Sequence, residues 1–216
     1  MPRSPRICPD GLPQHIVNRG NLRAQIFREP ADYLGFIAAL ADAAERTVVR
    51  LIAFCLMPNH WHLVLWPFKG SEISAYMQIL MNSHIRDLQQ RQGTSGTGHI
   101  YQGRYKNHPI ESGQHLLNVC RYVEANARAA GLVQDAQHWP WCSLSMNGPA
   151  EDVNLLSPSP VPRPAHWLDL VNRPQATKPI GSVRRGHPKI ASFSDNVLAS
   201  EGGWHLLEEK VPATRA

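Results

Sequence analysis

The chain has 216 residues, 43% of them hydrophobic, and its 22 Lys and Arg against 17 Asp and Glu give a formal net charge of +5. This length suits one well-packed domain with an appendage, and no apolar run approaches the roughly 18 residues that a membrane helix requires. The N-terminal residues lack the apolar segment of a secretory signal, and the four scattered cysteines argue against a disulfide framework or a cysteine zinc site. We therefore expect a cytoplasmic protein with reduced thiols.

The first part of the chain alternates between strand and helix patterns. Residues 14–18 form a short run ended by an Arg-Gly-Asn turn signal, which predicts a strand. A helix is predicted from Pro30, a position where proline costs no hydrogen bond, because apolar residues then recur at helical spacing. Residues 48–57 and 60–66 are rich in apolar and β-branched residues and are separated by a Pro-Asn pair, so they predict an antiparallel hairpin.

Three further elements are predicted before the composition changes. Residues 71–92 have a helical apolar face, a fourth strand is expected in the later part of 100–110, and 113–130 should form a helix capped by Gly131. The order strand, helix, strand, strand, helix, strand, helix matches a ferredoxin-like α+β unit. We expect a four-stranded, mostly antiparallel sheet with helices on one face and the other face open for a ligand.

A proline-rich tail is predicted to follow this unit. Eight prolines fall between Pro149 and Pro188, and apolar periodicity is lost from Gly148 onward. We place one domain at 1–146 and an extended, partly disordered, basic tail at 147–216. Between residues 170 and 194 there are five basic and no acidic residues, which fits either a nucleic-acid contact or an ordinary solvated tail.

His60 and His62 flank a tryptophan in the second strand of the predicted hairpin. Residues i and i+2 of a strand project from the same face, so both imidazoles point one way. Two neutral imidazoles can bind a divalent metal, with a third ligand from elsewhere in the fold. Spacing alone also allows two ordinary polar side chains on an open sheet face.

Tyr122 and Asn126 lie four residues apart on the last predicted helix, at the flank of its apolar stripe. By itself this position also fits a half-buried packing tyrosine with a solvated hydroxyl. Together with the two histidines, this tyrosine suggests metal-assisted attack on a phosphodiester. A cation on His60, His62 and the Asn126 oxygen would polarise a phosphodiester, which Tyr122 could attack to form a phosphotyrosine.

The stretch 56–66, centred on His60-Trp61-His62, resembles the histidine–hydrophobic–histidine motif of the HUH transposases and is most similar to the REP-associated tyrosine transposases. Other matching stretches occur in the family's order, at 15–21, 98–106, 121–126, 130–133 and 139–143. The resemblance runs from about residue 14 to 144. Ala127 departs from the proline common in the family, and the residues from Lys189 onward depart from the expected end of a basic tail.

This resemblance implies a ferredoxin-like catalytic domain with Mg²⁺ or Mn²⁺ on His60 and His62. It implies that Asn126 assists the metal site and that Tyr122 is the nucleophile. Tyr101 and Tyr105 are weaker candidates for the nucleophile. The implied substrate is single-stranded DNA with a foldback hairpin, in a bacterial cytoplasm and at the nucleoid when bound to DNA. The choice between a monomer and a homodimer stays open.

Contacts to DNA beyond the site are predicted from basic and aromatic residues. The candidates, each of which could also be a solvated edge residue, are Arg19, Arg104, Tyr105, Lys106, Arg184 and Arg185. Three other functions stay open: a domesticated hairpin binder or processing nuclease that no longer transposes, a metal-dependent hydrolase that uses water, and a non-catalytic RNA binder.

Overall fold

The computed structural model describes residues 8–94, 96, 98–145 and 155–174. None of the helices in this part of the chain is both long enough and apolar enough to span a membrane.

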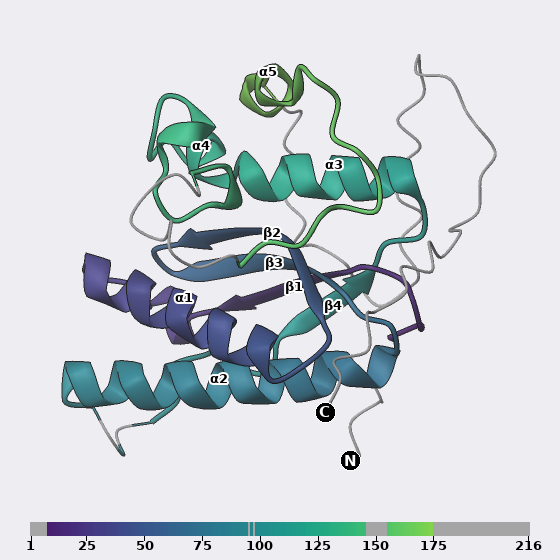
Figure 1. The fold of residues 1–216 in the computed structure, drawn as a ribbon. Coiled ribbons are helices and arrows are strands. Elements are labelled where there is room, and N and C mark those ends of the chain that lie inside the picture. Colours follow the sequence, from purple (N-terminus) through teal and green to yellow (C-terminus); the bar gives the residue numbers. More distant parts are fainter. Residues whose placement is uncertain (1–7, 95, 97, 146–154, 175–216) are drawn as a thin grey trace, which may run out of the picture. The chain divides into compact units, whose positions relative to one another are not determined.

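The centre of the fold is a four-stranded sheet with the order β2-β3-β1-β4. Its strands are β1 (Gln14–Arg19), β2 (Arg50–Met57), β3 (His60–Trp66) and β4 (Lys106–Pro109). Each neighbouring pair is antiparallel, and β2 and β3 form the expected hairpin (Figure 1). The α+β class and the ferredoxin-like strand order are therefore confirmed.

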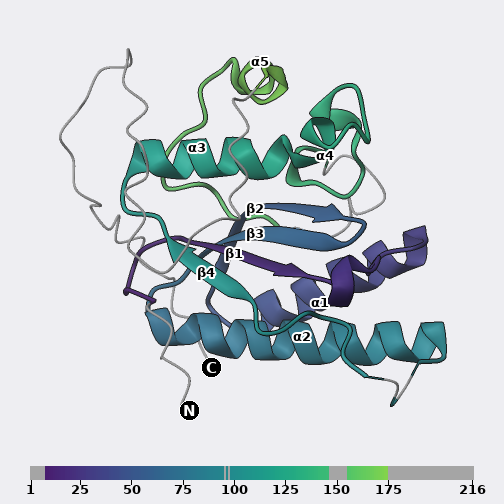
Figure 2. The same cartoon turned by 180° about the vertical axis from the view of Figure 1, so that it is seen from behind.

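The helices cover both faces of this sheet. The helices α1 (Pro30–Glu45) and α2 (Gly70–Gln92) pack against each other on one face, whereas α3 (Gly113–Glu124) lies across the other (Figures 1 and 2). The expectation that all helices lie on one face was wrong for α3. The reason is that every residue of β2 after Arg50 is buried. Successive residues of a strand face opposite sides of the sheet, so both faces need an apolar cover.

Local signals explain where the long helices start and stop. The α1 helix begins with Pro30 at its first position and with a capping box between Glu29 and Asp32. Gly93 ends α2 in the left-handed conformation at φ 62°. The Ser112 side chain accepts a hydrogen bond from the backbone N–H of His115 and caps α3.

The helix predicted over 113–130 is broken in two, because α3 ends at Glu124 and α4 spans Asn126–Ala129. At the break, the Asn126 side chain donates a 3.1 Å hydrogen bond to the backbone carbonyl of Tyr122. A side chain that takes the carbonyl of residue i−4 competes with the helical ladder. Gly131 then has the positive φ of 71° that the predicted C-cap requires.

Residues 155–174 pack against the domain, which differs from the poorly packed tail expected after residue 146. Leu155 is buried in the core, and the Ser157 N–H donates to the carbonyl of Leu51 at 2.8 Å. The short helix α5 (Trp167–Asn172) contacts α3. The remaining stretches of the predicted tail, 146–154 and 175–216, lie outside the described residues.

Candidate active site

The two histidines of the motif lie at the start of β3 and face α3. In the register with β1, His60 pairs with Arg19 and His62 pairs with Val17. The two imidazole ring centres are 5.1 Å apart with an interplanar angle of 83°. His62 is only 4% exposed and His60 is half-buried, so one ring lies in the interior and the other at its border.

The Tyr122 side chain projects from α3 toward the His62 ring. Its ring centre is 5.6 Å from that of His62, in an edge-to-face arrangement at 89°. The side chain is half-buried, as expected for a residue at the flank of the helix's apolar stripe. The sheet and α3 thus bring the two predicted histidine ligands and the predicted nucleophile together, whereas Asn126 lies on α4 and contacts Tyr122 through a hydrogen bond to its backbone carbonyl.

The orientation of His60 follows from its neighbour. Asn59 donates from its side-chain nitrogen to the carbonyl of Arg23 at 3.3 Å, which leaves its amide oxygen to face His60. That oxygen lies 2.7 Å from Nδ1 of His60 and can only accept, so Nδ1 carries the proton. The Nε2 atom of neutral His60 is then unprotonated, and its lone pair can bind a cation.

His62 has a partner that the sequence analysis did not select. Its Nδ1 atom lies 2.9 Å from Nε2 of His15, a residue of β1 that is 3% exposed. The Nε2 atom of His62 is buried and has no hydrogen-bond partner among the described residues. A buried imidazole nitrogen without a partner is the atom that a metal ion would satisfy.

Burial keeps these histidines neutral. It lowers the pKa of His60 to about 4 with a further effect from Arg19, and it lowers the pKa of His62 well below its usual value. Burial also lowers the pKa of His15 to about 3. Neutral imidazole is the form that binds a metal, so the rings are available as ligands across the physiological range.

The hydroxyl of Tyr122 is subject to opposing effects. Burial raises the pKa of Tyr122, whereas the Asn126 amide and the positive charge of Arg19 lower it. Arg19 is exposed at the end of β1 beside His60. Its charge therefore partly offsets burial, which leaves the pKa of Tyr122 above its usual value.

The donors predicted for a cation are two imidazole nitrogens and the side-chain oxygen of Asn126. The side-chain nitrogen of Asn126 is engaged with the carbonyl of Tyr122, so the oxygen is the atom left to bind a cation. Among the described residues no group of three His, Cys, Asp or Glu side chains could hold a metal. The unpartnered Nε2 of His62 and the adjacent neutral ring of His60 are of the chemical type that binds a divalent ion.

The competing tyrosines are less suited to nucleophilic attack. Tyr101 is buried, its hydroxyl accepts a 3.0 Å hydrogen bond from Nε1 of Trp61, and burial raises its pKa. The hydroxyl of Tyr105 is also buried. Of the tyrosines named in the sequence analysis, Tyr122 alone lies against the histidine pair.

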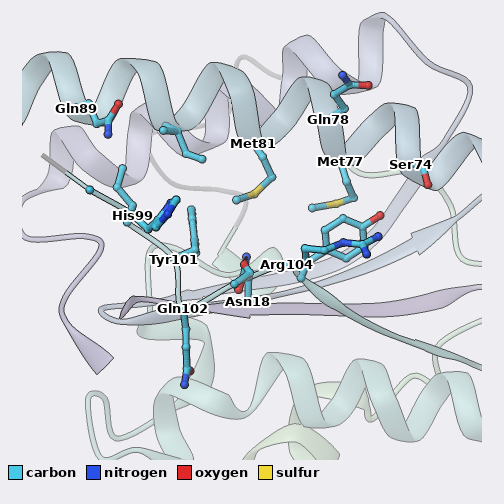
Figure 3. A pocket seen from close by; sticks show the side chains of 15 residues that line it. Asn18, Ser74, Met77, Gln78, Met81, Gln89, His99, Tyr101, Gln102 and Arg104 are labelled. Carbon is cyan, nitrogen blue, oxygen red and sulfur yellow. Dashed lines mark hydrogen bonds between the residues drawn. The ribbon is translucent and has the colours of Figure 1, made fainter. Parts of the chain in front are cut away.

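A groove of about 720 Å³ lies on the other face of β1 (Figure 3). The α2 residues Met77 and Met81 line one side, and the loop 98–105 lines the other, with Asn18 between them. Asn18 and Arg19 are consecutive on β1 and therefore project to opposite faces. The groove is thus separated from Tyr122 by the strand itself, while Gln102 at its border points away toward α3 (Figure 3).

The predicted DNA contacts differ in accessibility. Arg19, Arg104 and Lys106 are exposed, and Arg104 lines the groove. Tyr105 also lines it but is half-buried and packs against the core, so less of its ring is available for stacking than expected. Arg184 and Arg185 lie outside the described residues.

Known proteins resemble both the sequence and the fold of this chain. A protein of Haemophilus influenzae described as a REP-associated tyrosine transposase is 26% identical over 130 residues, which cover 56% of this chain and 73% of that protein. A REP-associated tyrosine transposase solved bound to a REP hairpin has a TM-score of 0.56 at 16% identity, covering 74% of this chain and 92% of that one. A transposase structure from Deinococcus radiodurans is 21% identical with a TM-score of 0.40, covering 56% and 95%.

The family match extends over more than half of the sequence. Residues 10–126 match the family described as "Transposase IS200 like", a span that includes both histidines, Tyr122 and Asn126. The chain therefore belongs to the IS200-like transposase family.

Proposed function

We propose that this protein cuts and rejoins single-stranded hairpin DNA through a covalent 5′-phosphotyrosine on Tyr122. The observation that carries the proposal is the edge-to-face packing of Tyr122 on His62, at 5.6 Å between ring centres. A nucleophile must lie within reach of the groups that activate its target, and the packing of the Tyr122 ring on His62 supports this role.

The proposed substrate is a DNA hairpin of the REP type. It is supported by the structural relative that was solved bound to a REP hairpin, and by the description of the Haemophilus influenzae protein. The net charge of +5 and the exposed Arg19, Arg104 and Lys106 are compatible with a polyanionic ligand. Arg184 and Arg185 remain proposed contacts to the hairpin stem.

The proposed cofactor is Mg²⁺ or Mn²⁺, held by Nε2 of His60, Nε2 of His62 and the side-chain oxygen of Asn126. When bound, the ion would neutralise the charge of the scissile phosphate and polarise it. The residues of the chain have separate roles. Asn59 holds the His60 ring, Asn126 and Arg19 partly offset the effect of burial on the pKa of Tyr122, and α3 packs the Tyr122 ring against His62.

The chemical step is a transesterification. The phenolic oxygen of Tyr122 forms a bond to phosphorus while the bond from phosphorus to the 3′-oxygen breaks. Water takes up the phenolic proton, and the departing 3′-oxygen takes up a proton to become a 3′-hydroxyl. One phosphoester replaces another, so a later 3′-hydroxyl can reverse the step and rejoin a strand without a nucleotide cofactor.

The test uses the full chain with a labelled single-stranded hairpin oligonucleotide and Mn²⁺, analysed on a denaturing gel. We expect a covalent protein–DNA adduct with the wild type and with the control variant Tyr33→Phe, a tyrosine of the core that does not line the groove, and no adduct with Tyr122→Phe. Strand cleavage that persists in Tyr122→Phe would instead indicate a hydrolase that uses water. Binding of the hairpin without cleavage by the wild type would indicate a binding protein, and either result would refute the proposal.

A further inference from the structure

We infer that His15 is a positioning residue, which fixes His62 in the tautomer that presents its Nε2 atom to the divalent ion. The inference rests on the metal site of the proposed function. It assigns to this residue of β1 a role that the histidine motif of β3 does not reveal.

The contact between the two rings is close and well defined. The Nε2 atom of His15 lies 2.9 Å from Nδ1 of His62, and the rings are stacked with centres 5.1 Å apart and an interplanar angle of 14°. His15 is 3% exposed and His62 is 4% exposed. A hydrogen bond between side chains this deeply buried holds both rings in one orientation.

Two tautomeric arrangements satisfy this hydrogen bond. In the first, Nδ1–H of His62 donates to Nε2 of His15, and Nε2 of His62 keeps its lone pair. In the second, Nε2–H of His15 donates to Nδ1 of His62, and the proton of His62 then lies on its Nε2 atom. Because Nε2 of His62 is buried without a partner among the described residues, the second arrangement buries an N–H with nothing to accept it.

The first arrangement also matches the neighbouring histidine. Asn59 accepts from Nδ1–H of His60, so His60 presents Nε2 as well. Each motif histidine would thus be held through Nδ1 by one polar group, the Asn59 oxygen or the His15 nitrogen. Metal-binding histidines commonly donate their second N–H to such a partner, which fixes both tautomer and ring orientation.

His15 has one neighbour that provides a matched control. His108 is its register partner on β4, and their ring centres are 6.2 Å apart. His108 is half-buried on the same border of the site and has no hydrogen bond to His62 among those described. Removing His108 therefore removes a nearby imidazole but leaves the contact between His15 and His62.

The first measurement is the tautomer of His62 in the metal-free protein, determined from its ¹⁵N chemical shifts by NMR. We expect wild type and His108→Ala to carry the proton on Nδ1 of His62. In His15→Leu the two tautomers should exchange, whereas His15→Gln should restore the Nδ1–H form because the amide oxygen can accept in place of Nε2. A wild-type His62 protonated on Nε2 would overturn the inference without any variant.

The second measurement is Mn²⁺ affinity by electron paramagnetic resonance, without DNA. We expect His15→Leu to weaken binding by about 10- to 100-fold, the usual effect of losing such a partner. His15→Gln should recover most of this loss, and His108→Ala should match the wild type. Equal affinities for His15→Leu and wild type would overturn the inference.

The two proposals can fail separately. If no covalent adduct forms, yet His15→Leu shifts the tautomer and weakens Mn²⁺ binding, the proposed function fails and the role of His15 stands. If the adduct forms on Tyr122 while neither measurement responds to His15→Leu, only the role of His15 is refuted.

Discussion

Nε1 of Trp167 donates a 2.7 Å hydrogen bond to Oε2 of Glu124, two residues beyond Tyr122 on α3. The other carboxylate oxygen accepts from Ser143 and from Arg163, each at 2.7 Å. Glu124 is fully buried, so these three bonds replace the water that the carboxylate gives up. The two bonds from Arg163 and Trp167 tie residues 155–174 to the helix that carries the proposed nucleophile.

Trp167→Phe should destabilise the protein by about 1 to 3 kcal/mol, because it leaves a buried carboxylate oxygen without one of its donors. The change is measured as the free energy of unfolding in urea. The adjacent Leu168→Ala is the control, since Leu168 is 42% exposed and its loss should cost no more than about 0.5 kcal/mol. Equal effects of the two variants would show that the bond to Glu124 does not hold this segment.

The burial of His84 predicts how the free energy of unfolding depends on pH. It is buried among Phe27, Phe36 and Tyr101, and neither of its ring nitrogens has a hydrogen-bond partner among the described residues. Burial lowers the pKa of His84 to about 3. Between pH 6.5 and about 3 the unfolded chain therefore binds a proton that the folded chain does not. The free energy of unfolding is thus highest above pH 6.5 and decreases as the pH falls below this value.

We expect His84→Leu to be at least as stable as wild type at pH 7 and to lose less stability between pH 6.5 and pH 4. One such group contributes at most about 1.4 kcal/mol per pH unit. Urea unfolding at several pH values measures this slope. Val48→Ala is the control, because the Val48 side chain does not titrate and is 58% exposed, so this change should leave the slope unchanged. A wild-type slope in His84→Leu would contradict the account.

The strands and most of the helices follow from local patterns in the sequence. Proline, glycine and alternating apolar residues predict β1, the hairpin of β2 and β3, and α2 to within one or two residues at most ends. The same-face rule also predicts that His60 and His62 share a face, and the helix flank brings Tyr122 near them. These features depend only on residues close together in the chain.

The features that the sequence did not predict depend on distant contacts. His15 and His62 are 47 residues apart, and no spacing rule selects one histidine of β1 as the partner of β3. The packing of residues 155–174 depends on Glu124, which the local sequence does not distinguish from any other polar residue of a helix. The break after Glu124 depends on the hydrogen bond from the Asn126 side chain to Tyr122, an alternative that apolar periodicity does not register.

The proposed metal site predicts strong coupling between metal and DNA. Its donors are two neutral histidines and an amide, so the full charge of the ion remains for an incoming phosphate. We expect a hairpin oligonucleotide to raise Mn²⁺ affinity at least about fivefold in the Tyr122→Phe variant, which cannot form the adduct. An oligonucleotide with an uncharged methylphosphonate at the scissile position is the control. The same affinity with both oligonucleotides would show that the phosphate does not complete the site.

Arg104 predicts a measurable electrostatic contribution to DNA binding. It is exposed at the border of the groove on the α2 side of β1. If it contacts one phosphate, Arg104→Ala should reduce the slope of log K against log salt by about one. Arg86→Ala is the matched control, because Arg86 is exposed on α2 but does not line this groove. An unchanged slope for Arg104→Ala would remove this residue from the DNA interface.

The most direct test of the central claim identifies the amino acid that carries the DNA. The adduct formed with hairpin DNA and Mn²⁺ would be digested with nuclease and trypsin and analysed by mass spectrometry. The account predicts a 5′-linked nucleotide on the tryptic peptide 122–128, which contains Tyr122 as its only tyrosine. A nucleotide on a peptide containing Tyr101 or Tyr105, or cleaved DNA without any modified peptide, would contradict it.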